Sequence, residues 1–375
     1  MTRQTGSADR RGFLVGSAAL GAAALAGCTG LIGGGEDEGD GGSVFGQIGS
    51  GREGRPEPGG TPVEEMPDLE GELTVYSGRG EFLVGTLIDD LEAYYDDFSI
   101  DPRYGDSADL VNQIEEEGSG TSADVFYTVD AGALGALADE GRTRELSDGV
   151  LEMVREEFRT DHWIGTSGRA RTVPYNTNAL SDDDMPDDID AYATGFDGDL
   201  GWAPSYGSCQ AFVTAMRLLE GDDATREWLE GVVASGITDY PDEFAVCQAI
   251  ADGEVDAGFT NHYYVERVRD GSSDAPIATS FTEGDAGAAF DVAGAAVTDA
   301  ADDPELAENF VRHLLSAQAQ EYFATTTFEY PLISGVEPVG DLPTIDELDV
   351  PSLDLAELSD LEPTIDLMRE VGIDT

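Results

Sequence analysis

The folded part of this 375-residue chain is introduced by the stretch Leu73-Thr74-Val75-Tyr76-Ser77-Gly78-Arg79. It is a short run of β-forming residues that stops at glycine, which is typical of a strand. Residues 82–95 follow, with apolar side chains from Phe82 to Tyr95 at helical spacing. The same alternation then repeats: a strand near 98–104 precedes a helix from Ser107 to about Glu117, and a strand over Ala123–Thr128 precedes a helix over Ala131–Gly141. Strands and helices that alternate at this spacing predict βαβ units and a parallel sheet.

A second alternating region is predicted from about Val173 to residue 280. Beyond it, Ala289–Val297 returns to strand character and precedes a helix at 304–323. In sheets of this kind ligands bind at the carboxyl ends of the strands, so the loops Ser77–Glu81 and Thr128–Gly132 are candidate rims of a site. We therefore predict an α/β protein of two lobes with a ligand cleft and a hinge between them. Its predicted parts are 71–172 and 281–336 in the first lobe, 173–280 in the second, and a C-terminal segment, 337–375, on the second lobe.

The charge of the chain is strongly acidic, with 78 acidic residues against 19 basic ones and a formal net charge of -59. All the basic residues are arginines. Repulsion on such a surface largely disappears in molar salt, where the Debye length is about 3 Å. We interpret the acidity as a surface adapted to high salt, with cation storage as the alternative. Nucleic acid is excluded as a partner, because phosphate binding needs a basic surface.

The N-terminal residues read as an export signal. Arg10 and Arg11 precede a weakly apolar run that ends Leu25-Ala26-Gly27-Cys28. Paired arginines before a short apolar run indicate twin-arginine export. The last four residues resemble a lipobox, so residues 1–27 are predicted to be removed and Cys28 to carry a lipid. No later segment approaches the roughly 20 apolar residues of a membrane helix.

Residues 28–70 are predicted to be a disordered acidic tether, because Gly, Glu, Asp and Pro cannot bury enough apolar surface to fold. Such a chain reaches roughly 35–40 Å. Two further cysteines, Cys209 and Cys247, either pair in an oxidising compartment or are buried free thiols.

A set of motifs in the folded part carries a family resemblance. They include Leu73–Arg79, Ser122–Tyr127 and Ser167–Arg171 with Tyr175-Asn176. They continue with Gly201–Pro204, Gln248–Val255, Asn261-His262-Tyr263-Tyr264, Ala295–Val297 and Glu329–Leu332. In this order the chain resembles the ferric-ion-binding proteins of iron ABC transporters over about residues 72–375. The resemblance implies the type II periplasmic binding-protein fold.

The adjacent Tyr263 and Tyr264 suggest a metal chemistry of their own. Ferric iron is a hard ion that favours anionic oxygen donors such as phenolate. Neighbouring residues of a strand point to opposite faces, so the two tyrosines can share an ion only on a loop or at a helix start. The alternative is that both are ordinary packing residues at a helix start. We expect His262 to support the site or lie on the surface.

The resemblance implies that Tyr263 and Tyr264 are iron ligands and that carbonate or phosphate binds with the iron. The anion site would lie at Ser205, Tyr206, Gly207 and Ser208, with Arg79 and Arg169 as clamps. For each arginine the alternative is a surface or structural ion pair. Tyr206 is a candidate third phenolate. Some relatives have a His and a Glu ligand where this chain has Gly80 and Val129. Glu81 and Asp130 are the sequence neighbours of these positions, and Asp130 is a candidate ligand, although a shift of one residue redirects a side chain. Glu243 stands where some relatives have an anion-contacting Asn.

The resemblance, together with the export signal, implies capture of ferric iron by a lipid-anchored binding protein at the outer face of the membrane. It would act as a monomer and deliver the iron to an ABC permease by hinge closure. The alternative is another solute, such as an oxyanion or a different metal. A secreted hydrolase is disfavoured, because the chain has no Gly-x-Ser-x-Gly or HExxH motif and only three histidines. An adhesive surface protein is a further alternative.

Overall fold

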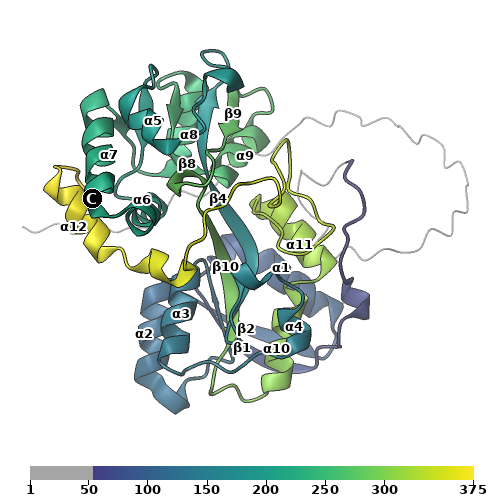
Figure 1. The fold of residues 1–375 in the computed structure, drawn as a ribbon. Helices are drawn as coiled ribbons and strands as arrows, with labels where there is room; N and C mark the ends of the chain where they lie inside the picture. Colours follow the sequence, from purple (N-terminus) through teal and green to yellow (C-terminus); the bar gives the residue numbers. More distant parts are fainter. Residues whose placement is uncertain (1–53) are drawn as a thin grey trace, which may run out of the picture. The chain divides into compact units, whose positions relative to one another are not determined.

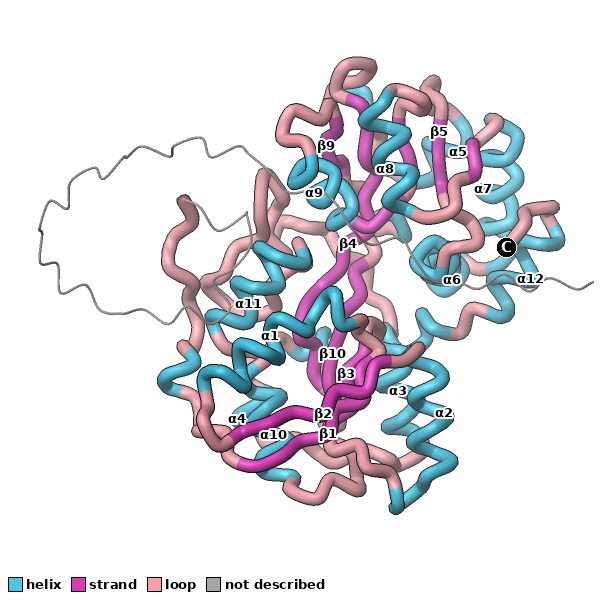
Figure 2. Tube along the Cα trace, turned by 180° about the vertical axis from the view of Figure 1, so that it is seen from behind, coloured by secondary structure: helices cyan, strands magenta, loops and turns pink. Residues whose placement is uncertain are grey.

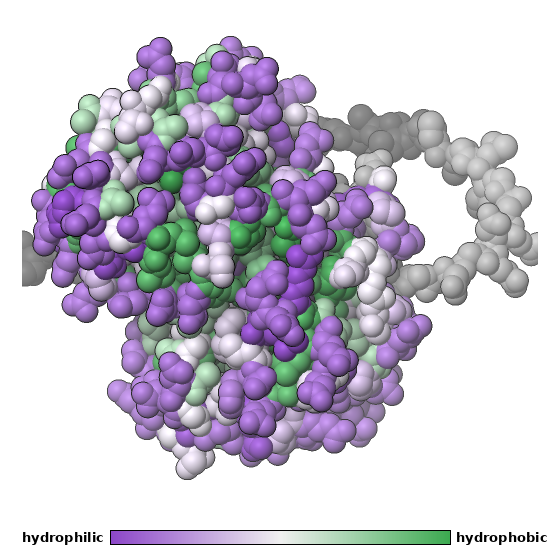
Figure 3. All heavy atoms as spheres, in the orientation of Figure 1, coloured by the Kyte–Doolittle hydropathy of each residue, from purple (hydrophilic) through white to green (hydrophobic). Residues whose placement is uncertain are grey.

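The computed structural model describes residues 54–375 of the chain. The paired arginines, the lipobox with Cys28 and most of the predicted tether lie outside the described residues. Within residues 54–375, no helix combines the length and the apolar character needed to cross a membrane. Hydrophilic residues cover most of the face drawn in Figure 3, as the acidic composition leads us to expect.

The first lobe is built on a parallel sheet. Strand β1 pairs in parallel with β2 on one side and with β3 on the other. Helix α1 lies to one side of these strands, and α2 and α3 lie to the other (Figures 1 and 2). The carboxyl ends of β1 and β3 therefore share one edge. The elements are β1 (Gly71–Ser77), α1 (Glu81–Tyr94), β2 (Phe98–Tyr104), α2 (Ser107–Glu117), β3 (Val125–Thr128), α3 (Ala131–Asp139) and α4 (Asp148–Leu151).

A single long strand, β4 (Ile164–Asn176), runs through both lobes (Figure 1). Its first part pairs antiparallel with β10 (Phe290–Val297), up to the pair of Ala170 with Phe290. From Arg171 onward it pairs with strands of the second lobe instead. Nearly all of β4 is buried, so it lacks the alternation that marks a half-exposed strand. The strand therefore changes its partners between Ala170 and Arg171.

The second lobe surrounds short strands with helices. Strand β5 is parallel to β6 and β7, whereas β7, β8 and β9 are antiparallel to β4. A cluster of aromatic rings, Phe212, Trp228 and Phe259, packs beneath β8 with ring centroids 5.4–5.7 Å apart. The elements are α5 (Ile189–Thr194), β5 (Leu200–Trp202), α6 (Gly207–Glu220), α7 (Asp222–Ser235), β6 (Thr238–Asp239), α8 (Glu243–Asp252), β7 (Ala257–Gly258), β8 (Thr260–Asn261), α9 (His262–Gly271) and β9 (Ile277–Ser280).

After β10 the chain forms two helices where the sequence suggested one over 304–323. Helix α10 (Pro304–His313) ends, and α11 (Ala317–Tyr322) begins with Ser316, whose hydroxyl accepts a hydrogen bond from the Ala319 N–H. Serine is a strong start signal at this position. A π-helical turn (Phe323–Thr327) follows. The chain then passes a short 3-10 helix (Leu355–Ser359) and ends near α12 (Glu362–Glu370), which packs against α6 and α7.

The last part of the predicted tether is ordered, which corrects the sequence interpretation. Residues 54–70 include a short 3-10 helix (Val63–Glu65) and the buried side chains of Val63 and Leu69. Arg55 forms an ion pair with Glu321, with 2.9 Å between Nε and Oε1. A few apolar anchors spaced along this acidic segment are sufficient to dock it, and composition averaged over the whole segment hides them.

The two cysteines of the second lobe are free and buried. Burial raises the pKa of Cys209 and that of Cys247 to about 12. Both side chains therefore act as small apolar core residues, the second of the two possibilities that the sequence left open.

Candidate functional site

Two of the predicted iron ligands lie in the first turn of α9, directly after β8. Tyr263 and Tyr264 are both buried, and their ring centroids are 4.4 Å apart. The helix start is the geometry that lets adjacent side chains lie together, whereas a strand would separate them. Asn261 precedes the helix with extended backbone, and its side-chain amide donates to the hydroxyl of Tyr263 over 3.2 Å.

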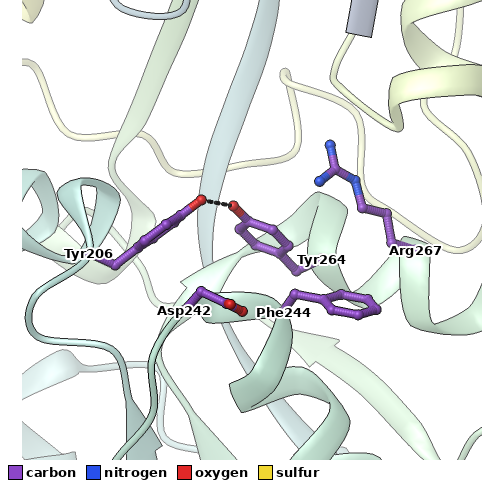
Figure 4. A pocket seen from close by; sticks show the side chains of 5 residues that line it. All are labelled: Tyr206, Asp242, Phe244, Tyr264 and Arg267. Atoms are coloured by element: carbon purple, nitrogen blue, oxygen red, sulfur yellow. Dashed lines mark hydrogen bonds between the residues drawn. The ribbon is translucent and has the colours of Figure 1, made fainter. Parts of the chain in front are cut away.

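The third tyrosine reaches the same place from another helix. Tyr206 occupies the position before α6, and its hydroxyl oxygen lies 2.8 Å from that of Tyr264. Figure 4 shows the two phenol oxygens facing each other. Two phenol oxygens at this distance can bind one cation between them or, without a cation, share a hydrogen bond.

These oxygens border a hollow of about 410 Å³, which we call the tyrosine pocket. Its lining consists of Tyr206, Asp242, Phe244, Tyr264 and Arg267 (Figure 4). Asp242 also begins α8, where its carboxylate accepts from the Ala245 N–H over 2.8 Å. The volume lies within the range of about 300–1,000 Å³ that is typical of small-molecule sites.

Tyr263 and Tyr264 hold their protons firmly in the absence of a ligand. Burial raises the pKa of Tyr264, and the neighbouring Tyr263 and Glu243 raise it further. Burial also raises the pKa of Tyr263, although Arg169 acts in the opposite direction. Both phenols are therefore neutral near pH 7, and a bound cation would have to displace the protons.

A buried polar network supports the start of α9. Arg171 pairs with Glu243 at 2.6 Å and also donates to the side-chain oxygen of Asn261 over 3.1 Å. The second carboxylate oxygen of Glu243 accepts from the Asn261 N–H over 2.8 Å. Because the amide of Asn261 also contacts Tyr263, the network fixes the tyrosine through hydrogen bonds. The carboxylate of Glu243 is thus paired with the Arg171 guanidinium and is not free to contact a ligand.

The predicted anion clamps Arg79 and Arg169 already have partners inside the protein. Arg79 is fully buried, pairs with Glu329 at 2.5 Å and donates to the Ser167 hydroxyl over 2.8 Å. Arg169 forms an ion pair with Asp291. We call these five residues the arginine cluster. The structure does not place Arg79 or Arg169 in the lining of the tyrosine pocket.

The predicted anion site at the start of α6 is close to the tyrosines. Ser205 and Gly207 are exposed, and Tyr206 is in the pocket. The Ser208 hydroxyl is buried and has no hydrogen-bond partner among residues 54–375, and the same is true of one guanidinium nitrogen, Nη2, of Arg171. The other terminal nitrogen of Arg171 lies 3.5 Å from the Ser208 carbonyl, so these unpaired groups are neighbours.

Asp130 is not joined to the tyrosines. Its carboxylate begins α3 by accepting from the Ala133 N–H over 2.8 Å. Gly80 begins α1 and, like Val129, offers no ligating side chain. In the part of the chain from 54 to 375, no three His, Cys, Asp or Glu residues are grouped so that they could hold a metal. The tyrosines are therefore the main metal donors that the described residues provide.

His262 lies behind the site rather than in it, as a supporting residue. It is fully buried, and its Nε2–H donates to the Phe328 carbonyl over 2.8 Å while Nδ1 accepts from the Ala170 N–H over 3.2 Å. Burial lowers the pKa of His262 to about 4, so the ring is neutral. Phe328 is the non-glycine residue with positive φ in the described chain, at 61°. His262 therefore links α9 to β4 and to the returning segment.

Three residues of the pocket lining, Asp242, Phe244 and Arg267, were not predicted from the sequence, and Arg267 is the one that contacts the tyrosines. Its guanidinium carbon lies 4.9 Å from the ring centroid of Tyr263 and 5.3 Å from that of Tyr264. Arg267 follows Tyr263 by four residues and Tyr264 by three, and residues at these spacings are neighbours on a helix surface. The sequence therefore predicts this contact only if the helix continues beyond Tyr264.

Comparisons with known proteins agree with this architecture. Residues 86–347 match the family described as bacterial extracellular solute-binding protein. The chain is 29% identical over 310 residues to the Fe(3+)-binding periplasmic protein of Serratia marcescens, covering 80% of this chain and 90% of that protein. It is 30% identical over 302 residues to iron uptake protein A2 of Synechocystis sp., covering 75% and 86%.

A solved structure matches the fold closely. Iron-bound HitA from Pseudomonas aeruginosa superimposes with a TM-score of 0.71 at 28% identity, covering 80% of this chain and 99% of that one. This likeness confirms the predicted two-lobed α/β fold of the type II binding proteins. The chain belongs to the bacterial extracellular solute-binding protein family.

Proposed function

We propose that this protein captures ferric iron through the phenol oxygens of Tyr206, Tyr263 and Tyr264. The observation that carries the proposal is the 2.8 Å approach of the Tyr206 and Tyr264 hydroxyls at the wall of a hollow, with Tyr263 packed beside them. Ferric iron is the common biological cation that such hard, anionic oxygen donors suit best. The names of the relatives, which are iron-binding and iron-uptake proteins, support the same cargo.

Proton release accompanies binding in this proposal. The pKa values of Tyr263 and Tyr264 are raised by burial, so iron must displace a proton from each phenol that it binds. The apparent affinity for iron therefore increases with pH. Three phenolates leave part of the iron coordination sphere open, so a further ligand is needed.

Carbonate or phosphate is the proposed further ligand. The unpaired Ser208 hydroxyl and the unpaired Arg171 nitrogen are buried donors beside the start of α6. Backbone N–H groups at a helix start also favour an anion, which adds Ser205, Tyr206 and Gly207 to the proposed anion site. Arg79 and Arg169 are left out of this site because Glu329 and Asp291 already neutralise them.

Delivery of the iron completes the proposal. The chain is exported by the twin-arginine route, anchored by a lipid on Cys28 and adapted to high salt, and it closes about the hinge at Ala170 and Arg171 when iron binds. The closed monomer docks on an ABC permease. Binding of another metal or an oxyanion by the same fold is the second candidate, which the missing ligands at Gly80 and Val129 favour.

A visible absorption titration with ferric citrate in molar KCl, with and without carbonate, tests the cargo. We expect a phenolate-to-iron charge-transfer band in the wild type and its loss in the Tyr263→Phe/Tyr264→Phe variant. Tyr104→Phe, which removes a half-exposed phenol outside the site, is the matched control and should keep the band. Absence of the band from the wild type with either anion would contradict ferric binding and leave the second candidate.

A further inference from the structure

Arg267 differs from the other arginines of the described chain in having no internal partner. Each of the others between residues 54 and 375 pairs with a carboxylate or donates to a backbone carbonyl. None of the described residues forms an ion pair or a hydrogen bond with Arg267. In a chain with 78 acidic residues, a guanidinium without a carboxylate partner is unusual, and a bound ligand can supply that partner.

The position of Arg267 directs its free donors to the tyrosine pocket. The half-buried side chain rests on the rings of Tyr263 and Tyr264 and lines the pocket beside the latter. In Figure 4 its guanidinium lies on the same side of the pocket as the two phenol oxygens. Contact with aromatic rings stabilises the cation without consuming its N–H donors, so all five remain for a ligand.

The pocket therefore offers donors for a cation and a separate donor for an anion. The phenol oxygens suit a metal, whereas the guanidinium suits a carboxylate, which it can bind with two parallel hydrogen bonds. The remaining charged residue of the lining, Asp242, uses Oδ1 to accept from the Ala245 N–H at the start of α8. A metal that still carries an organic chelator fits this combination.

We infer that Arg267 is a specificity-determining residue that binds a carboxylate of a chelator attached to the iron. The cargo is then a ferric polycarboxylate complex, with Tyr206 and Tyr264 on the metal and Arg267 on a carboxylate that the metal leaves free. This inference rests on the proposed function and makes it more specific. It does not involve the buried donors at Ser208 and Arg171, which do not line the tyrosine pocket.

Two ferric complexes of different charge test the inference. Ferric citrate offers carboxylates to Arg267, and ferric acetohydroxamate offers none. Affinities are measured from the charge-transfer band in molar KCl, and radiolabelled citrate in equilibrium dialysis shows whether the chelator stays with the iron. The variant is Arg267→Gln. The control, Arg369→Gln, removes the same charge from the exposed end of α12.

The wild type should retain about one citrate for each iron. Loss of a charge-assisted pair predicts that Arg267→Gln binds ferric citrate about ten- to a hundredfold more weakly and releases the citrate. Its affinity for ferric acetohydroxamate should change less than about threefold. Arg267→Lys, which keeps the charge but loses the paired geometry, should show an intermediate loss.

Two results would overturn the inference while leaving ferric binding intact. One is an equal loss of affinity for both complexes in Arg267→Gln, which would make Arg267 a general support of the tyrosines. The other is binding of iron by the wild type without retained citrate. Absence of the charge-transfer band from the wild type with both complexes would contradict the proposed function itself.

Discussion

The tyrosine pocket and the arginine cluster both contain arginine and hydroxyl side chains, but they differ in whether these side chains have partners within the protein. In the arginine cluster Arg79 and Arg169 each have a carboxylate partner, and Ser167 bridges to Glu329. In the tyrosine pocket Arg267 has no partner in the described chain, and the phenol of Tyr206 has only Tyr264. The first arrangement is complete without a ligand, whereas the second is completed by one.

This difference distinguishes polar residues that stabilise the fold from polar residues that bind a ligand. The family resemblance made Arg79 a candidate anion clamp, and Arg79 does follow the first strand, at the edge of the sheet where ligands bind. Its guanidinium, however, is already paired with Glu329, which lies 250 positions further along the chain. A buried polar group marks a ligand site only when the protein leaves part of its bonding capacity unused.

The strongest effect is expected from breaking the arginine cluster. Arg79→Met leaves Glu329 buried without its cation, which should lower the free energy of unfolding by about 3–5 kcal/mol. The iron affinity of the folded fraction should not change. Denaturant unfolding and iron titration of the same samples measure both quantities. A large loss of iron affinity with unchanged stability would instead restore Arg79 to the anion site.

His313 and Tyr95 form another buried polar pair, in the first lobe, whose members bond to each other within the protein. His313 is buried, its Nδ1–H donates to the Asn309 carbonyl and its Nε2 accepts from the Tyr95 hydroxyl over 2.7 Å. Burial lowers the pKa of His313 to about 4, below the reference value of about 6.5. Between these values the unfolded chain binds a proton that the folded protein does not, so stability falls as the pH falls.

The full decrease from this histidine is about 3 kcal/mol between pH 6.5 and pH 4. We expect the stability difference between wild type and His313→Gln to shrink by this order as the pH is lowered through that window. Chemical unfolding at several pH values measures it. Tyr95→Phe keeps the buried ring and should keep the slope. A constant difference at all pH values would mean that His313 is not held neutral.

A smaller effect is expected from the third tyrosine. Tyr206→Phe removes one phenol oxygen but leaves Tyr263 and Tyr264 in place, so iron affinity should fall about tenfold, or about 1.4 kcal/mol. The charge-transfer band should weaken and shift rather than disappear. Titration alongside Tyr264→Phe, which should lose at least ten times more affinity, ranks the two. Equal affinities of Tyr206→Phe and wild type would remove Tyr206 from the ligand set.

Much of the fold could be predicted because its signals are local. The strands and helices between Leu73 and Asp139 follow from apolar spacing and glycine stops. Strand β4 was not predicted, because a strand buried on both faces lacks alternation. The packing of residues 54–70 was missed because a few anchors such as Val63 act through contacts distant in sequence. The exact lobe boundaries stay a prediction, since β4 belongs to both lobes.

The site was less predictable, because its contacts join residues that are distant in sequence. Adjacent tyrosines can be recognised from sequence, but the approach of Tyr206 to Tyr264 joins residues 58 positions apart. The partners of Arg79 and Arg169 lie at even greater separations. Arg267 needed only the continuation of one helix past Tyr264. Pairing across the fold decides which arginine is free, and no local pattern contains that information.

An iron-edge anomalous diffraction map of the protein crystallised with ferric citrate tests the central claim most directly. We expect one strong peak within bonding distance of the Tyr206 and Tyr264 hydroxyl oxygens, with Arg79 still paired to Glu329. A peak beside Asp130 and Asp291, or no peak at the tyrosines, would contradict the claim that the tyrosine pocket is the iron site and that the arginine cluster stabilises the fold without binding the ligand.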